Sequence, residues 1–170
     1  MQCFCGMVHD MGRRGFLGAL MAAAVDAQAP TPASAGPADS ALIDDLVAAN
    51  RILYDQGVVD GFGHVSSRHN KEPNRYLMSR SMAPALVTAE DILEYDLDST
   101  PIDQRGRAVY LERFIHGEIY KARPDVRAIV HSHSPSVIPY ANVKTPLRPM
   151  NHIAGFLGGG VPVFEIRDTA

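Results

Sequence analysis

The chain has 170 residues and an ordinary globular composition, with 46% hydrophobic and 21% charged residues. This length predicts a single domain at most, and the composition argues against a disordered or a membrane-spanning chain. The formal net charge is −3, and the basic residues of the body are scattered singly, so we expect no nucleic-acid partner. Both cysteines, Cys3 and Cys5, stand at the N-terminus, which leaves the body without a thiol nucleophile or ligand.

Paired arginines precede a short apolar run near the N-terminus. Arg13 and Arg14 stand before Phe16–Val25, which is as long as the apolar part of a signal peptide and too short to cross a bilayer. The segment resembles a twin-arginine export signal in its Arg-Arg-x-Phe-Leu pattern, and this implies a periplasmic protein with no membrane contact after cleavage. The alternative is a disordered leader or a mis-assigned start, with a cytoplasmic protein. Either way, we expect residues 1–38 to lie outside the fold.

The body begins with an amphipathic helix, followed by two strands. Asp39 or Ser40 can cap a helix whose apolar residues recur at helical spacing from residue 42 to residue 53, and Gly57 ends it. A glycine-containing turn at 60–63 then leads into a polar strand, and a turn near residue 73 precedes a strand at Arg75–Ser79. The glycines allow close approach of a ligand, although the residues alone favour a structural role for this turn.

The second half of the body also alternates between strand and helix patterns. A capping box at Thr88–Asp91 precedes a strand at 92–97, and a helix is expected over about 110–122. The predicted buried stripe of this helix is Leu111, Phe114, Ile115 and Ile119. Further strands are expected before His133 and at Val161–Ile166. This alternation, with short antiparallel-type turns, predicts a mixed α/β layered domain.

His131 and His133 are the most informative pair of residues. At i, i+2 in an extended segment, both side chains point the same way, and two imidazoles can bind one cation with Glu112 as a third ligand. On spacing alone, a hydrogen-bonded pair is the more frequent role of such histidines. Glu112 itself is alternatively a carboxylate favoured by the helix dipole, with His116 as its hydrogen-bonded partner.

The stretch from Glu112 to His133, with the turn Gly61–Arg68 and the segment Ser79–Ser81, resembles the class II aldolase/adducin family from residue 42 onward. The resemblance implies a three-layer α/β/α sandwich around a central, mainly antiparallel sheet. It also implies a homotetramer with active sites near subunit interfaces. Members hold a divalent cation, usually zinc and sometimes manganese or another first-row metal, with three histidines. The third histidine is expected beyond the last residue, so residues 39–170 are expected to be a C-terminally truncated, partial domain.

The resemblance implies a function and a set of site residues. We expect a divalent-metal-dependent carbon–carbon lyase, an aldolase or a decarboxylase, that acts through a metal-stabilised enolate on a small hydroxy-carbonyl or hydroxy-carboxylate substrate. His64 stands where sugar-phosphate aldolases usually carry asparagine, which favours the decarboxylase branch. The alternative is an inactive truncated chain or an adducin-like interaction module. The expected residues are Glu112 as catalyst and ligand; His131 and His133 as ligands; Gly63, His64, Ser66, Arg68, Ser79, Arg80 and Ser81 around a carboxylate or phosphate; and His116 and His152 as supports for the ligands.

Overall fold

A computed structural model describes residues 36–164 as parts of two compact units, 36–135 and 136–164, which are treated separately. The export segment lies outside the described residues, so its prediction stays a prediction. Between residues 36 and 164, no helix combines the length and apolar character needed to cross a membrane.

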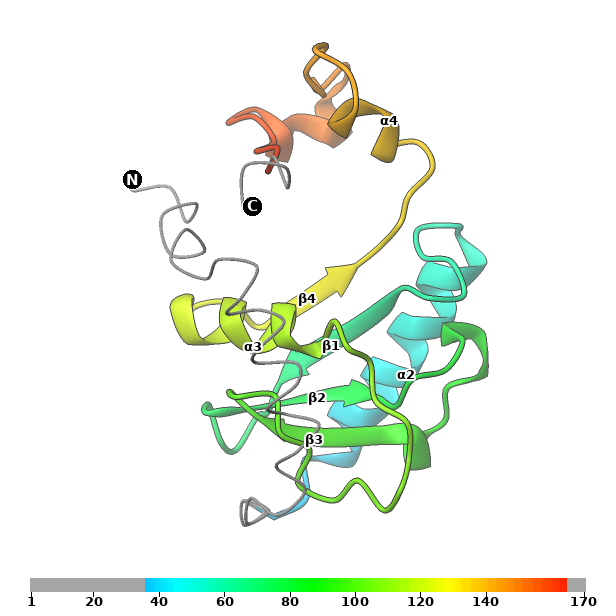
Figure 1. Cartoon of the computed structure of the whole chain (residues 1–170), viewed down its shortest axis with the longest axis vertical. Coiled ribbons are helices and arrows are strands. Elements are labelled where there is room, and N and C mark those ends of the chain that lie inside the picture. The colour runs from blue at the N-terminus through cyan, green and yellow to red at the C-terminus, as the bar shows by residue number, and fades with distance from the viewer. Residues whose placement is uncertain (1–35, 165–170) are drawn as a thin grey trace, which may run out of the picture. The chain divides into compact units, whose positions relative to one another are not determined.

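The first unit is built on a four-stranded antiparallel sheet. Its strands are β1 (His64–Arg68), β2 (Arg75–Ser79), β3 (Ile92–Asp96) and β4 (Ala128–His131), in the order β3-β2-β1-β4 (Figure 1). All three pairings are antiparallel, as the sequence predicted. The pairing of β1 with β4 joins segments about 60 residues apart in the chain, and it brings His64 opposite His131.

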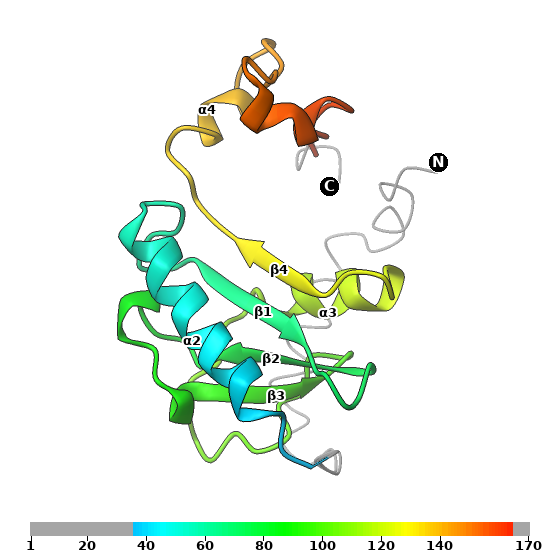
Figure 2. The same ribbon diagram turned by 180° about the vertical axis from the view of Figure 1, so that it is seen from behind.

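Helices cover both faces of this sheet. Figure 1 shows α3 (Arg113–Ala122) in front of the strands, and Figure 2, from behind, shows α2 (Ser40–Asp55). Leu46 of α2 packs with Val65 and Leu77 on one face. Because side chains alternate along a strand, the neighbours of Leu77 point to the other face. There Tyr76 and Met78 join a second cluster with Leu93, Tyr95, Tyr110 and Tyr120.

Two local features follow their sequence signals. The helix α2 starts at Ser40, directly after the predicted cap residue Asp39, whose side chain makes no capping hydrogen bond, and Gly57, with a φ of +66°, follows its C-cap residue Gln56. The predicted capping box is present: Thr88 and Asp91 satisfy each other's backbone and side-chain groups around the 3-10 turn η3 (Ala89–Asp91). A second 3-10 turn, η2 (Pro84–Leu86), precedes it.

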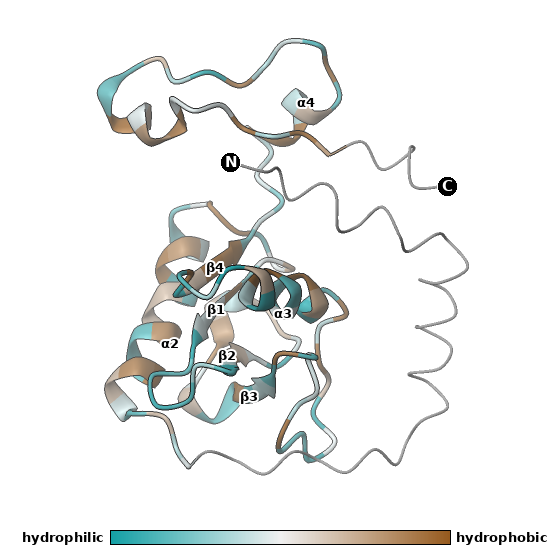
Figure 3. Ribbon diagram, turned by 90° about the vertical axis from the view of Figure 1, so that its left-hand side faces the viewer, coloured by the Kyte–Doolittle hydropathy of each residue, from teal (hydrophilic) through white to brown (hydrophobic). Residues whose placement is uncertain are grey.

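The predicted buried stripe of α3 is wrong at three of its four residues, since Ile119 is partly buried. Leu111, which precedes the helix, is 70% exposed, and Phe114 and Ile115 are also exposed, whereas His116, Gly117 and Tyr120 are buried. Figure 3 shows both hydrophobic and hydrophilic stretches on α3. The buried face is fixed by close contact: a Cβ on Gly117 would collide with Ser99 Oγ and lie 2.7 Å from the Leu97 carbonyl oxygen. The close approach at Gly117, together with the hydrogen bonds of His116 and Tyr120 described below, decides which face of α3 meets the sheet.

The second unit, residues 136–164, contains two short helical segments, α4 (Ile138–Ala141) and the 3-10 helix η4 (His152–Leu157). Asn151 caps η4, because its side chain accepts a hydrogen bond from the Ala154 amide. The strand predicted at Val161–Ile166 is not formed over its described part, 161–164. A strand needs a hydrogen-bonded neighbour, and residues 136–164 contain no other strand.

Candidate metal centre

Two histidines face each other across the neighbouring strands β1 and β4. His64 opens β1, His131 ends β4, and the two are partners in the antiparallel register. Their rings stack with centroids 4.8 Å apart and an interplanar angle of 16°. His64 is fully buried, with its ring also packed 4.3 Å from that of Tyr110, whereas the side chain of His131 is 22% exposed. The pair therefore reaches from the core to the surface.

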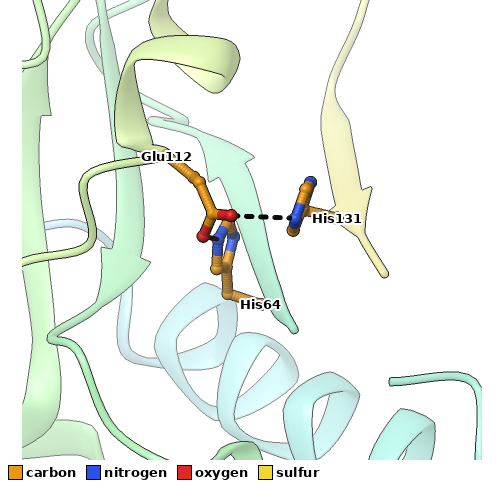
Figure 4. Close-up of side chains that lie close together, drawn as sticks. All are labelled: His64, Glu112 and His131. Carbon is orange, nitrogen blue, oxygen red and sulfur yellow. Dashed lines mark hydrogen bonds and ion pairs between the residues drawn. The ribbon is translucent and has the colours of Figure 1, made fainter. Parts of the chain in front are cut away.

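Glu112 completes a three-residue cluster with these histidines. Its carboxylate faces a ring nitrogen of each, with Oε2 3.4 Å from His64 Nε2 and Oε1 3.5 Å from His131 Nε2 (Figure 4). One possible ligand atom from each of His64, Glu112 and His131 lies within 4.8 Å of the others. Two imidazoles and a carboxylate are a donor set that zinc accepts, with a further coordination position left for water or substrate.

The position of Glu112 depends on the start of α3. Arg113 donates through Nε to the Ser99 carbonyl and through Nη1 to the Tyr110 carbonyl. The Arg113 carbonyl in turn accepts from the hydroxyls of Ser99 and Tyr76, at 3.0 and 3.1 Å. Ser99 is buried and has a φ of +64°, which non-glycine residues seldom adopt. The side chain and the carbonyl of Arg113 are thus both held by hydrogen bonds, and they fix the backbone of the preceding residue, Glu112.

His133 lies beside the cluster and has its own partner. Its Nε2 is 3.0 Å from His131 Nε2 and 4.0 Å from Glu112 Oε1, while its Nδ1 is 3.3 Å from Asp60 Oδ2. A carboxylate on the far nitrogen of a histidine is a common support for a metal ligand. The other Asp60 oxygen accepts from the Phe62 and Gly63 amides, both at 2.9 Å. The structure thus brings the predicted ligands Glu112, His131 and His133 together and adds His64.

Behind His64 runs a row of buried hydrogen bonds. His64 Nδ1 lies 2.9 Å from His116 Nε2, and His116 Nδ1 lies 2.6 Å from Ser66 Oγ. Ser66 Oγ is also 2.8 Å from the Tyr120 hydroxyl. His64, His116 and Ser66 are fully buried, and Tyr120 is 1% exposed. His116, expected to support a ligand, contacts His64 in this structure.

Burial sets the charge state of this row. It lowers the pKa of His64 to about 4; the neighbouring His131 lowers this pKa further, and Glu112 acts in the opposite direction. Burial also lowers the pKa of His116 to about 3, with help from the nearby His64. Both rings are therefore neutral near pH 7. A neutral imidazole is the form that binds a metal ion.

Arg68, predicted to bind an anion, is occupied by backbone groups. Its guanidinium donates to four carbonyl oxygens, those of Pro73, Tyr120, Arg123 and Val126, and the residue is 5% exposed. The guanidinium also lies over the Tyr120 ring, 4.6 Å from its centroid. These contacts favour a structural role, because Arg68 ties the end of α3 and the segment after it to β1.

Two more predicted anion-binding residues have structural partners. Ser66 is part of the buried row, so its hydroxyl faces His116 and Tyr120. Gly63 donates its amide to Asp60, and a Cβ on it would lie 2.6 Å from Val59 Cβ and 3.0 Å from the His131 carbonyl oxygen. Glycine at this position therefore allows β1 to approach β4 closely.

The last predicted residues lie at the C-terminal end of β2, which the register places beside the start of β1, and in the second unit. Ser79 is buried at the end of β2, and Ser81 donates its amide to the Ala108 carbonyl. Arg80 Nε forms an ion pair with Asp91 at 2.6 Å. His152 opens η4, is exposed, and belongs to the unit 136–164. Substrate binding by these residues stays a prediction.

Comparison with known proteins identifies the family. Residues 44–169 match the sequence profile of the class II aldolase and adducin N-terminal domain. The chain belongs to this family. The class II aldolase fold is also seen in solved structures: an L-fuculose 1-phosphate aldolase from Glaciozyma antarctica is 28% identical, with a TM-score of 0.65, over 81% of this chain and 57% of that one.

Two curated relatives of this class II aldolase family member are decarboxylases. The decarboxylase tropJ of Talaromyces stipitatus is 40% identical over 123 residues, which are 71% of this chain and 46% of the relative. The 3,4-dihydroxyphthalate decarboxylase of Arthrobacter keyseri is 31% identical over 134 residues, 70% of this chain and 53% of the relative. The chain thus spans about half the length of these two relatives.

The sequence did not reveal several residues of the site. Asp60 was read only as part of a turn, yet it contacts His133 from 73 residues away. Tyr110 and Tyr120 were expected only as parts of a helix. The sequence placed Glu112 and His116 on one face at i, i+4, and the same spacing extends to Tyr120, which was not included in that face.

Proposed function

We propose that this chain carries the divalent-cation site of a carbon–carbon lyase, and that its reaction is the decarboxylation of a small hydroxylated carboxylate. The observation that carries the proposal is the convergence of His64, Glu112 and His131 on one point. Asp60 contacts His133 Nδ1, and His116 contacts His64 Nδ1. Both contacts fit a cation site, because they leave the Nε2 atoms of His133 and His64 facing it.

Decarboxylation is favoured over aldol cleavage by the relatives. Two decarboxylases are 40% and 31% identical to the chain, and one of them is named for 3,4-dihydroxyphthalate. The family resemblance adds that His64 replaces the usual asparagine of the aldolases. An aromatic carboxylate with a neighbouring hydroxyl is accordingly the proposed substrate class.

The chemistry divides between the cation and Glu112. When bound, a divalent cation acts as a Lewis acid that stabilises the negative charge left when the carbon–carbon bond breaks. His64, His131 and His133 would hold ring nitrogens towards it. The Glu112 side chain is 41% exposed, so it can take a proton from water and deliver it to the carbon that loses CO2. Its two oxygens face different histidines, so a proton on one oxygen leaves the other free to accept.

The test has two stages. The purified chain is first stripped with a chelator, and the binding of Zn2+ and Mn2+ is measured by calorimetry for the unmodified chain and for His131→Ala/His133→Ala. We expect one site in the unmodified chain and a loss of affinity of at least about 100-fold in the variant, since two donors are removed. Equal binding by both proteins would contradict the proposed site.

The second stage measures CO2 release from 3,4-dihydroxyphthalate and related hydroxybenzoates, with L-fuculose 1-phosphate as the aldolase control. Release of CO2 that depends on the cation and on Glu112 is the expected result. Cleavage of the sugar phosphate alone would make the chain an aldolase. Cation binding without turnover of any substrate would favour the inactive or adducin-like alternative.

We also propose that the protein assembles as a homotetramer. Leu111, Phe114 and Ile115 lie at i, i+3 and i+4 and expose apolar side chains on or beside α3. Light scattering is expected to give four times the chain mass, and Phe114→Glu/Ile115→Glu a smaller one. A monomeric unmodified chain would contradict this.

We propose export on the arginine pair and the apolar run that follows it, Phe16–Val25. Arg13→Lys/Arg14→Lys is expected to keep the protein in the cytoplasm at its full mass, and fractionation with mass spectrometry measures both. Cytoplasmic location of the unmodified chain with an intact leader would contradict the proposal.

A further inference from the structure

The row of buried hydrogen bonds behind His64 can run in either direction. Each link joins two groups that can both donate and accept: His64 Nδ1 with His116 Nε2 at 2.9 Å, His116 Nδ1 with Ser66 Oγ at 2.6 Å, and Ser66 Oγ with the Tyr120 hydroxyl at 2.8 Å. We propose that His116 is a positioning residue whose reversible hydrogen bond lets His64 Nε2 serve either as a donor to Glu112 or as a cation ligand. The inference rests on the proposed cation site and concerns how the chain adapts to it.

In the first arrangement, every proton points towards Glu112. Tyr120 donates to Ser66, Ser66 donates to His116 Nδ1, and His116 Nε2 donates to His64 Nδ1. His64 Nε2 then carries a proton and donates to Glu112 Oε2, which lies 3.4 Å away. The negative carboxylate at the end of the row favours this direction in the cation-free protein, because an ionised acceptor makes the stronger hydrogen bond.

In the second arrangement, the direction is reversed. A cation needs the lone pair of His64 Nε2, so the proton of that ring must sit on Nδ1 and point to His116 Nε2. His116 then carries its proton on Nδ1 and donates to Ser66, which donates to Tyr120. Each ring and each hydroxyl holds one proton in both arrangements, so the net charge of the row is unchanged. Water that enters during brief opening of the site can exchange the protons between nitrogens.

The buried end of the row argues against a different role, that of a proton path. Tyr120 is 1% exposed, and burial raises the pKa of its hydroxyl to about 12. A group of this kind does not release protons to solvent near pH 7. The row therefore ends in the core, and its function is to satisfy His64 in either tautomer. If the partner of His64 Nδ1 could only donate or only accept, one of the two His64 tautomers would leave this buried nitrogen without a hydrogen bond, at a cost of about 1–3 kcal/mol.

Histidine tautomers give a direct test. The full chain is labelled with 15N in its histidines, and the ring nitrogens are assigned in the chelator-treated and the Zn2+-loaded protein, since protonated and unprotonated nitrogens have well separated 15N shifts. We expect His64 and His116 to carry their protons on Nε2 without the cation and on Nδ1 with it. A His116 tautomer that stays the same while Zn2+ binds would overturn the inference.

Two substitutions at residue 116 separate reversible hydrogen bonding from packing. His116→Phe keeps a flat ring but neither donates nor accepts, and we expect Zn2+ affinity to fall by about 10–100-fold, as for other residues that orient ligands. His116→Gln keeps a reversible group, because its amide can turn to donate or accept, and most of the affinity is expected to return. Affinities are measured by competition with a chromophoric chelator, with folding checked by circular dichroism.

The outcomes distinguish this inference from the proposed function. If the unmodified chain binds no cation, the proposed site fails and the inference fails with it. If the unmodified chain and His116→Phe bind Zn2+ equally well, the site stands and the inference is wrong. If His116→Phe does not fold, the tautomers of the unmodified chain decide.

Discussion

Asp60 Oδ2 lies 3.3 Å from His133 Nδ1, although 73 residues separate the two in the chain. The same carboxylate holds the turn before β1 through the Phe62 and Gly63 amides, which keeps the pKa of Asp60 below its usual range. One side chain thus shapes the turn that precedes His64 and orients His133. The turn and the candidate metal centre are therefore structurally coupled.

The first prediction separates these two roles of Asp60. Asp60→Asn keeps an oxygen for the two amides but replaces the charged acceptor of His133 with a neutral group. We expect Zn2+ affinity to fall by about tenfold, with little change in thermal stability. Calorimetry and thermal melts measure the two quantities. Asp55→Asn, a change of an exposed carboxylate at the end of α2, is the matched control, and an equal loss of affinity there would count against a specific role for Asp60.

The second prediction concerns the carboxylate between the histidines. Glu112→Gln keeps the shape of the side chain but removes its charge, so we expect weaker cation binding, by about tenfold or more, and a loss of CO2 release of at least about 100-fold. Glu118→Gln, an exposed position on α3, is the control and should leave both quantities unchanged. Full turnover by Glu112→Gln would show that another group delivers the proton.

Arg68 is the subject of the third prediction. A lysine in its place cannot reach four carbonyl oxygens from one plane, so Arg68→Lys is expected to lower the free energy of unfolding by about 2–4 kcal/mol. Arg123→Lys, at an exposed arginine paired with Asp125, should change it by no more than about 0.5 kcal/mol. Urea unfolding gives both values. If the Arg68→Lys protein were as stable as the unmodified chain and had lost only substrate affinity, the result would support the predicted anion-binding role of Arg68.

Comparison of sequence and structure shows where local patterns suffice. The start of α2, the strand Arg75–Ser79 and the capping box at Thr88 depend on neighbouring residues, and the structure confirms all three. The buried face of α3 was misjudged because hydrophobicity alone ignores Gly117, which permits close approach, and the hydrogen bonds of His116.

The contacts of the site depend on pairings that no local pattern contains. Glu112, His131 and His133 share one region, as the sequence predicted, although Glu112 is the N-cap residue before α3 and His133 lies beyond the end of β4, so that periodicity alone does not place them. The contribution of His64 required the register of β1 against β4. The roles of Asp60 and Arg68 likewise required knowledge of which backbone segments lie beside them, since an aspartate in a turn or an arginine in a polar strand is ordinarily solvated.

The last prediction concerns acid stability in the presence of a chelator. The pKa of His64 falls to about 4 and that of His116 to about 3 in the folded chain, chiefly through burial, against about 6.5 for a histidine in the unfolded chain. Well above pH 6.5, at about pH 7.5 and higher, both rings are neutral in both states, so they add no pH dependence. As the pH falls below 6.5, the unfolded chain takes up protons that the folded chain refuses, and stability is lost until the folded pKa values are reached.

Between pH 6 and pH 4.5, unfolding should therefore take up close to two protons from this pair, and His116→Gln should reduce that number by about one. The surrounding charged groups, Glu112, His131 and His133, are unchanged in this variant. The free energy of unfolding in urea, measured at several pH values, gives the proton uptake from its slope. The carboxylates whose pKa values are lowered, such as Asp91 and Asp125, lose their contribution mainly below pH 4, outside this window. A flat profile from pH 6 to pH 4.5 would contradict the buried, neutral state of His64 and His116.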